Sequence, residues 1–93
     1  MMRDTVLTLS AVSRVDDGYM VFAQQIFSDV VAVEFGYNKE LLVLPYGSDT
    51  WQVVEDYNEI VISYGEFTYK IHKRNNPIWM QELNSALCKC WCS

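Results

Sequence analysis

The spacing of apolar residues changes once along this chain, and that change sets the class of fold. Between Thr5 and Val15, apolar and polar residues alternate, as they do in a strand with one buried face. Near the C-terminal end, apolar residues instead recur every three or four positions, which is typical of a helix with one buried side. The sequence therefore predicts strands first and one helix last.

Short apolar runs bounded by turn residues predict further strands. These runs are residues 30–35, 41–44, 59–64 and 67–72. Gly65-Glu66 separates the last two runs and predicts a tight hairpin, because glycine takes the positive φ that the first central position of a type II′ turn requires. For residues 51–55 two interpretations remain open: a strand, or a helical turn capped by Asp49.

The segment Tyr19–Phe27 also fits two structures. As a strand, it would pair with the first strand across Asp16-Asp17-Gly18, since Asp-Gly is a strong hairpin signal. As a helix, it would place Tyr19, Phe22, Ala23 and Ile26 on one side. We favour the strand, because a two-residue turn signal is local and specific.

A helix is predicted over about residues 76–91. Asn76 can cap it, and Pro77 suits its first position, where a missing N–H costs nothing. Its apolar residues fall within one arc of roughly 140°: Trp79, Met80, Leu83, Ala86, Leu87, Cys90 and Trp91. Because so wide an arc needs a sheet to cover it, the sequence predicts a single α+β domain, residues 1–93. In that domain the helix packs on one face of an antiparallel sheet of about five to seven short strands.

Acidic residues concentrate in the middle of the chain. The 93 residues include twelve acids and seven Lys or Arg, for a net charge of −5. Ten of the acids lie between Val15 and Glu66, where Lys39 is the only basic residue. This balance argues against direct nucleic-acid binding, which relies on basic residues to neutralise phosphates. It favours a basic partner instead.

Many of these acids fall at expected turns, with tyrosines beside them. We expect the following residues to form an exposed partner-binding surface: Asp16, Asp17, Tyr19, Tyr37, Tyr46, Asp49, Glu55, Asp56, Tyr57, Glu59 and Glu66. Acids attract a basic protein surface, and tyrosines supply contact area at low entropic cost. The alternative is a solvated rim that only keeps a small protein in solution.

The sequence contains no recognisable catalytic motif. It has no Gly-x-Ser-x-Gly elbow, no Gly-rich phosphate loop ending in Lys-Ser/Thr and no His-Glu-x-x-His. Glu55-Asp56 together with Glu59 offers two carboxylates of the kind that glycoside hydrolases use. We do not expect them to be catalytic, because acids at turns are usually solvated. His72 is the single histidine, and it lies in a basic stretch. We therefore expect no enzyme activity and no cofactor.

Three cysteines, Cys88, Cys90 and Cys92, lie at the C-terminal end. An odd, clustered set makes a poor disulfide framework and indicates reduced thiols in the cytoplasm. A zinc site needs four ligands, and only His72 could add one, so we expect no metal. On a helix, Cys90 would join the apolar arc, with Cys88 and Cys92 on the polar side.

No membrane segment or secretory signal is expected. The longest apolar runs have only about four or five residues, too few to cross a bilayer. The start of the chain carries Asp4 and lacks the long apolar core and small-residue cleavage site of a signal peptide.

Together these features predict a non-enzymatic protein-binding modulator. The specific expectation is an inhibitor that docks on a basic, nucleic-acid-handling partner, of the kind that phages and mobile elements encode. One alternative is a structural homo-oligomer, because Trp79, Leu83, Leu87 and Trp91 exceed what one small sheet covers. Another is a small anion- or metal-binding protein, using the basic stretch 70–74 beside the helix start or the terminal thiols.

Overall fold

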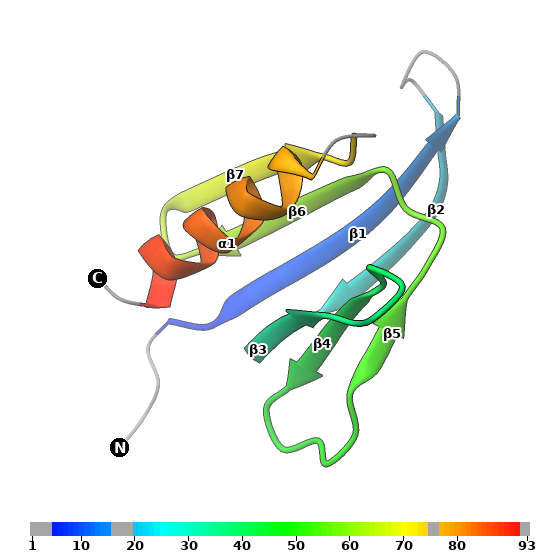
Figure 1. The fold of residues 1–93 in the computed structure, drawn as a ribbon. Helices are drawn as coiled ribbons and strands as arrows, with labels where there is room; N and C mark the ends of the chain where they lie inside the picture. The colour runs from blue at the N-terminus through cyan, green and yellow to red at the C-terminus, as the bar shows by residue number, and fades with distance from the viewer. Residues whose placement is uncertain (1–4, 16–19, 75–76, 92–93) are drawn as a thin grey trace.

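A computed structural model describes residues 5–15, 20–74 and 77–91 (Figure 1). These residues form seven strands and one helix, which confirms the α+β class. The elements are β1 (Leu7–Val15), β2 (Met20–Phe27), β3 (Val30–Phe35), β4 (Leu41–Pro45), β5 (Gln52–Val54), β6 (Glu59–Tyr64), β7 (Phe67–His72) and α1 (Ile78–Trp91). The segment with two interpretations, Tyr19–Phe27, is therefore a strand from Met20 onward, and residues 52–54 are a strand rather than a helical turn.

The strands form two antiparallel sheets, whereas the sequence predicts one. The four-stranded sheet has the order β2-β1-β6-β7, and the three-stranded sheet has the order β3-β4-β5. The chain leaves the larger sheet between β2 and β3 and returns to it between β5 and β6. Asp29 and Asp56 lie at these two crossings with φ of 54° and 57°, a region that aspartate tolerates better than most residues. The division thus depends on two backbone turns that apolar periodicity does not encode.

The four-stranded sheet has one apolar face, which points into the molecule. The pairing of β1 with β6 places Leu9 opposite Ile62 and Ala11 opposite Ile60. All four side chains are buried, whereas Ser10, which points to the other face, is partly exposed. The alternation predicted for residues 5–15 is confirmed over Leu7–Ala11; it breaks at Val12, which is buried at 3% exposure, and at the register shift between Ser13 and Arg14.

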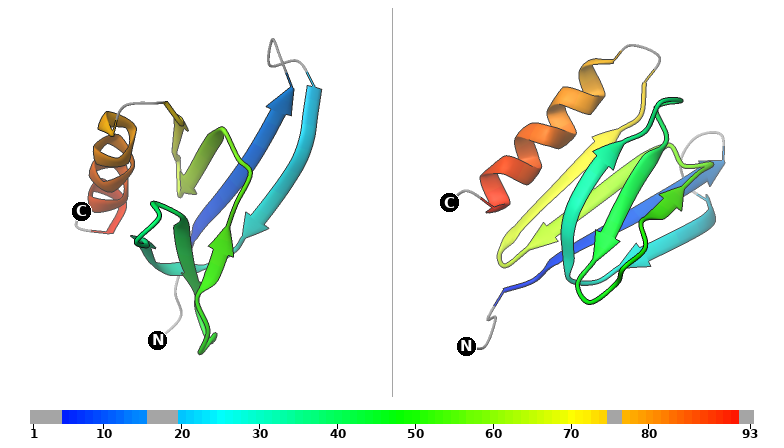
Figure 2. Two further views of the ribbon diagram at one scale, coloured as in Figure 1. Left: turned by 45° about the vertical axis from the view of Figure 1, so that its right-hand side comes forward. Right: turned by 60° about the horizontal axis from the view of Figure 1, so that its bottom comes forward.

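The helix and the three-stranded sheet lie side by side over this apolar face (Figure 2). α1 packs against β6 and β7. The ring of Trp79 on α1 meets the ring of Phe35 on β3 edge to face, with 5.5 Å between the centroids. A single cluster of buried residues is therefore shared by both sheets and the helix.

The predicted apolar arc of the helix is largely confirmed. The buried residues of α1 are Trp79, Leu83, Ala86, Leu87 and Cys90. Met80 is partly buried, and Trp91 is 38% exposed. Trp79, Leu83 and Leu87 are covered by the core of the same chain, so of the four residues behind the homo-oligomer alternative only Trp91 is exposed.

The boundaries of α1 and of the last hairpin agree closely with the sequence. Gly65 has a φ of 61° in the β6–β7 turn, as the hairpin prediction requires. Pro77 directly precedes α1, and its carbonyl accepts a hydrogen bond from the backbone N of Met80 at 3.1 Å. Asn76, the predicted cap, lies outside the described residues. α1 has 14 residues, and no helix among the described residues is long and apolar enough to cross a membrane.

Candidate protein-binding surface

The three-stranded sheet has a largely apolar outward face. In the strand register, Leu42 lies between Glu34 and Val53, and Leu44 lies beside Ala32. Val53 is 51% exposed, and the other three apolar side chains are partly exposed. Figure 2 (right) shows this sheet in front of the larger one, with no described element over it. We call Ala32, Leu42, Leu44 and Val53 the outer apolar face.

Exposed aromatic residues flank the outer apolar face. Trp51 is 36% exposed and precedes Val53 by two residues, so strand alternation places both on the same side. Tyr46 follows β4 and is 67% exposed. Tyr37, in the β3–β4 turn, is fully exposed. Tyrosine and tryptophan are enriched in protein interfaces, where each buries a large area.

The three-stranded sheet and its connections also carry acidic side chains; Glu34 lies opposite Leu42, whereas Glu55 and Asp56 line a hollow shared with β1 and β2. Exposed or partly exposed carboxylates come from Glu34, Glu40, Asp49, Glu55 and Asp56, which we call the acidic rim. The outer apolar face and the acidic rim together have the composition of an interface, with an apolar centre and a polar edge. The sign of the rim matches a positively charged partner.

A hollow of about 450 Å³ opens between two members of the acidic rim. Glu34, Tyr37, Glu40 and Leu42 line it, together with the residues between them on β3. Oε2 of Glu40 accepts a hydrogen bond from the backbone N of Asn38 at 3.2 Å, which fixes this carboxylate. Two carboxylates beside a tyrosine ring and a leucine suit a lysine or arginine side chain, whose stem is apolar and whose end is charged.

The predicted partner-binding residues fall into three groups. Tyr37, Tyr46, Asp49, Glu55 and Asp56 are exposed and belong to the three-stranded sheet or its connections. Glu66 is exposed but lies in the β6–β7 turn of the other sheet. Asp16, Asp17 and Tyr19 lie outside the described residues.

For Tyr57, the expectation of an exposed side chain is wrong. Tyr57 is only 6% exposed, and its ring packs edge to face on Trp79 with 6.2 Å between the centroids. Nζ of Lys73 lies 4.6 Å from the centre of the same ring. The hydroxyl is buried with no hydrogen-bond partner among the described residues, and burial raises the pKa of Tyr57 to about 12. Tyr57 belongs to the core, because the free energy gained by burying its ring exceeds the cost of leaving its hydroxyl without a hydrogen-bond partner.

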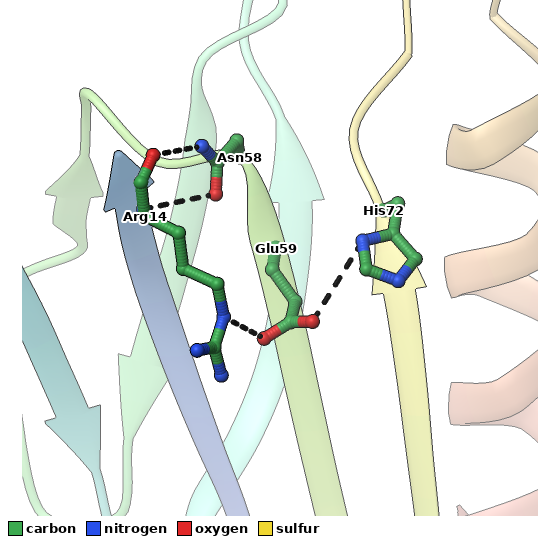
Figure 3. Close-up of polar contacts among 4 residues, drawn as sticks. All are labelled: Arg14, Asn58, Glu59 and His72. Atoms are coloured by element: carbon green, nitrogen blue, oxygen red, sulfur yellow. Dashed lines mark hydrogen bonds and ion pairs between the residues drawn. The ribbon is translucent and has the colours of Figure 1, made fainter. Parts of the chain in front are cut away.

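For Glu59 the expectation is also wrong, because this residue is 4% exposed. Its Oε2 accepts a hydrogen bond from Nε of Arg14 at 3.1 Å, and its Oε1 lies 3.7 Å from Nδ1 of His72 (Figure 3). Asn58 holds Arg14 in place, since its side chain exchanges two hydrogen bonds with the Arg14 backbone at 2.9 and 3.2 Å. The carboxylate therefore connects β1, β6 and β7 within the fold. It does not join Glu55 and Asp56 in a carboxylate cluster.

Neither the outer apolar face nor the exposed Glu34 and partly exposed Glu40 are among the residues that the sequence predicts for partner binding. Leu42 and Leu44 alternate with Leu41 and Val43 in an uninterrupted apolar run, which is typical of a strand buried on both faces. Only Leu41 and Val43 are fully buried. The charge of Glu34, opposite Leu42 in the register, was the one signal that this side meets solvent.

The two described cysteines of α1 differ in exposure. Cys90 is buried, and burial raises the pKa of its thiol, so it stays protonated and packs as a small apolar side chain. Cys88 is exposed, as the helical arrangement predicts, and Cys92 lies outside the described residues. Within the described ranges, no three His, Cys, Asp or Glu side chains gather in a way that could hold a metal ion.

Comparison with known proteins provides no further assignment. No protein-family model, curated protein or solved structure matches this chain. The functional interpretation therefore depends on the surface described above.

Proposed function

We propose that this chain is a non-enzymatic protein-binding modulator that docks through the outer apolar face and the acidic rim. One observation carries the proposal: the described residues leave the outer apolar face uncovered, and the exposed carboxylate of Glu34 lies opposite Leu42 on that face. Large exposed apolar patches with a polar edge are typical of interaction sites. The partner is a protein with a basic surface.

The two parts of the surface have different roles in this proposal. Val53, Leu42 and Trp51 supply apolar area, whose burial stabilises the complex. The acidic rim orients the partner and raises the association rate. A second copy of the chain would present the same carboxylates, so charge repulsion disfavours pairing of two copies through this face.

Basic surfaces are common on proteins that handle nucleic acids, because those surfaces neutralise phosphates. A small acidic protein that covers such a surface would inhibit its owner. We therefore propose an inhibitor of a nucleic-acid-handling protein, acting in the cytoplasm and of the kind that phages and mobile elements encode. The charge and exposure of the acidic rim support this proposal, and no sequence motif adds to it.

Affinity capture with three versions of the chain tests this function. The versions are the unmodified protein, the double variant Glu34→Lys/Glu55→Lys, and the matched control Glu66→Lys, which reverses an exposed carboxylate in the other sheet. We expect one basic protein from the host lysate to bind the unmodified protein and Glu66→Lys, and to be lost from the double variant. Rising salt should weaken this capture by screening the charges. Capture that ignores both the double substitution and salt would contradict the proposal.

A further inference from the structure

A second cleft, of about 270 Å³, lies where the β3–β4 turn meets the connection between β7 and α1. Three of the seven basic residues of the protein line it: Lys39, Lys73 and Arg74. Pro77, Trp79 and Met80 form much of the remaining wall, and none of the described residues that line the cleft is acidic. In a protein with a net charge of −5, so many cations around one cleft are unexpected.

Residues far apart in the sequence supply these cations. Lys39 is the only basic residue in the acidic middle of the chain, and its backbone N donates a hydrogen bond to the carbonyl of Gly36 at 3.0 Å. The backbone N of Lys73 donates to the carbonyl of Asn58 at 2.9 Å. Backbone hydrogen bonds therefore fix both of these lining residues within the fold.

The cations of this cleft are only partly compensated. Nη1 of Arg74 pairs with Oε1 of Glu82 at 3.1 Å. Neither Lys39 nor Lys73 forms an ion pair with another described residue, although Nζ of Lys73 lies 4.6 Å from the centre of the Tyr57 ring. Like charges around one small cleft repel one another, and a bound anion would reduce that repulsion. α1 also begins at this cleft, and the positive end of its helix dipole adds to the attraction.

We propose that this cleft binds the phosphate group of a small phosphorylated molecule. Three cationic side chains suit a doubly charged oxyanion better than a single carboxylate. A long polyanion such as nucleic acid is disfavoured, because the acidic residues of the same molecule would repel it. This site is distinct from the outer apolar face and does not depend on the proposed function.

Thermal unfolding in the presence of inorganic phosphate tests this site, with sodium chloride at equal ionic strength as the reference. At a phosphate concentration ten times Kd, we expect Tm to rise by an amount on the order of 5 °C. Acetate at the same concentration should give a much smaller rise. The variant Lys39→Gln should weaken phosphate binding about tenfold, the loss expected for one charge-assisted contact.

Lys89→Gln is the matched control, because Lys89 is an exposed lysine near the far end of α1. It should leave phosphate binding unchanged. Lys39 is also exposed, so Lys39→Gln should keep the Tm of the unmodified protein when no phosphate is present. The proposal fails if phosphate stabilises no more than chloride or acetate, or if Lys89→Gln weakens binding as much as Lys39→Gln. It also fails if Lys39→Gln abolishes a dimer, since the cations would then pair with a second copy.

Discussion

Nε of Arg14 donates a hydrogen bond to Oε2 of Glu59 across 3.1 Å, and the Glu59 side chain is only 5% exposed. The pair joins β1 to β6 on the face of the large sheet that the helix does not cover. Arg74 and Glu82 form an ion pair of the same length, but both of those side chains are well exposed. The two pairs differ mainly in burial, so they allow a direct comparison of a buried and an exposed ion pair within one protein.

Glu59→Gln should lower the free energy of unfolding by about 1–3 kcal/mol, because it leaves Arg14 beside a neutral group in a partly buried place. Glu82→Gln, the matched control, should change it by less than about 0.5 kcal/mol, since water solvates both exposed partners. Urea unfolding of the two variants measures the difference. Equal effects would mean that burial does not strengthen the Arg14–Glu59 pair.

Tyr57→Phe should leave stability at pH 7 unchanged or raise it by up to about 1 kcal/mol, because it removes a buried hydroxyl that has no partner among the described residues. The pKa of Tyr57 rises from 10.0 to about 12 on burial, so the folded protein holds this proton more tightly than the unfolded chain. The resulting stability is present below pH 10 and is lost as the pH rises to 12.

The unmodified protein should therefore lose on the order of 2 kcal/mol more than Tyr57→Phe between pH 10 and 12. Urea unfolding across this pH range measures the loss. Tyr37→Phe is the control, since Tyr37 is fully exposed, and it should follow the unmodified protein. If Tyr57→Phe shows the same alkaline loss, burial of the phenol is not its cause.

Trp51→Ala should weaken binding to the captured basic partner at least about tenfold, because a buried interface tryptophan often dominates affinity. Phe67→Ala is the control, since Phe67 is 60% exposed and belongs to β7 of the other sheet. Isothermal titration measures both affinities, and urea unfolding checks that each variant is folded. A larger effect of Phe67→Ala would move the interface to the four-stranded sheet.

Gly36→Ala should displace the carboxylate of Glu40, because a Cβ at position 36 would overlap the end of that side chain. The end of a glutamate moves easily, so we expect a loss of less than about 1 kcal/mol in stability. Association with the basic partner should slow in surface plasmon resonance, as the hollow loses one fixed carboxylate. Gly47→Ala is the comparison: a Cβ there would meet no atom, so any loss of stability comes from its left-handed backbone, with φ of 81°, and the association rate should stay unchanged. An unchanged association rate for Gly36→Ala would exclude the hollow from the interface.

The sequence predicted most secondary structure because the local signals agree with tertiary packing. The alternation of β1, the Gly65 turn and the apolar arc of α1 each report directly on one element. The two-sheet arrangement was not predictable in the same way. It depends on where the chain crosses between sheets, at Asp29 and Asp56. A single residue with positive φ does not change the spacing of apolar residues in the sequence.

The candidate surface was predictable only for residues at turns. Tyr37, Tyr46 and Asp49 were expected to be exposed because turn residues meet solvent. Tyr57 and Glu59 follow a turn as well, yet their side chains point to buried positions, and only the packing of Trp79 and Arg14 reveals this. The exposure of Leu42 was not predicted, because an uninterrupted apolar run does not show that no other element packs on one face of the strand.

The β3–β4 turn contributes to both proposed sites, since Tyr37 and Glu40 line the acidic hollow while Lys39 lines the cationic cleft. An occupant of either site would restrict the same few backbone bonds. If phosphate in the cleft changes the affinity for the basic partner by some factor, the partner must change phosphate affinity by that same factor. The concentration of a phosphorylated metabolite would in this way change how much of the protein is bound to its partner, through the β3–β4 turn.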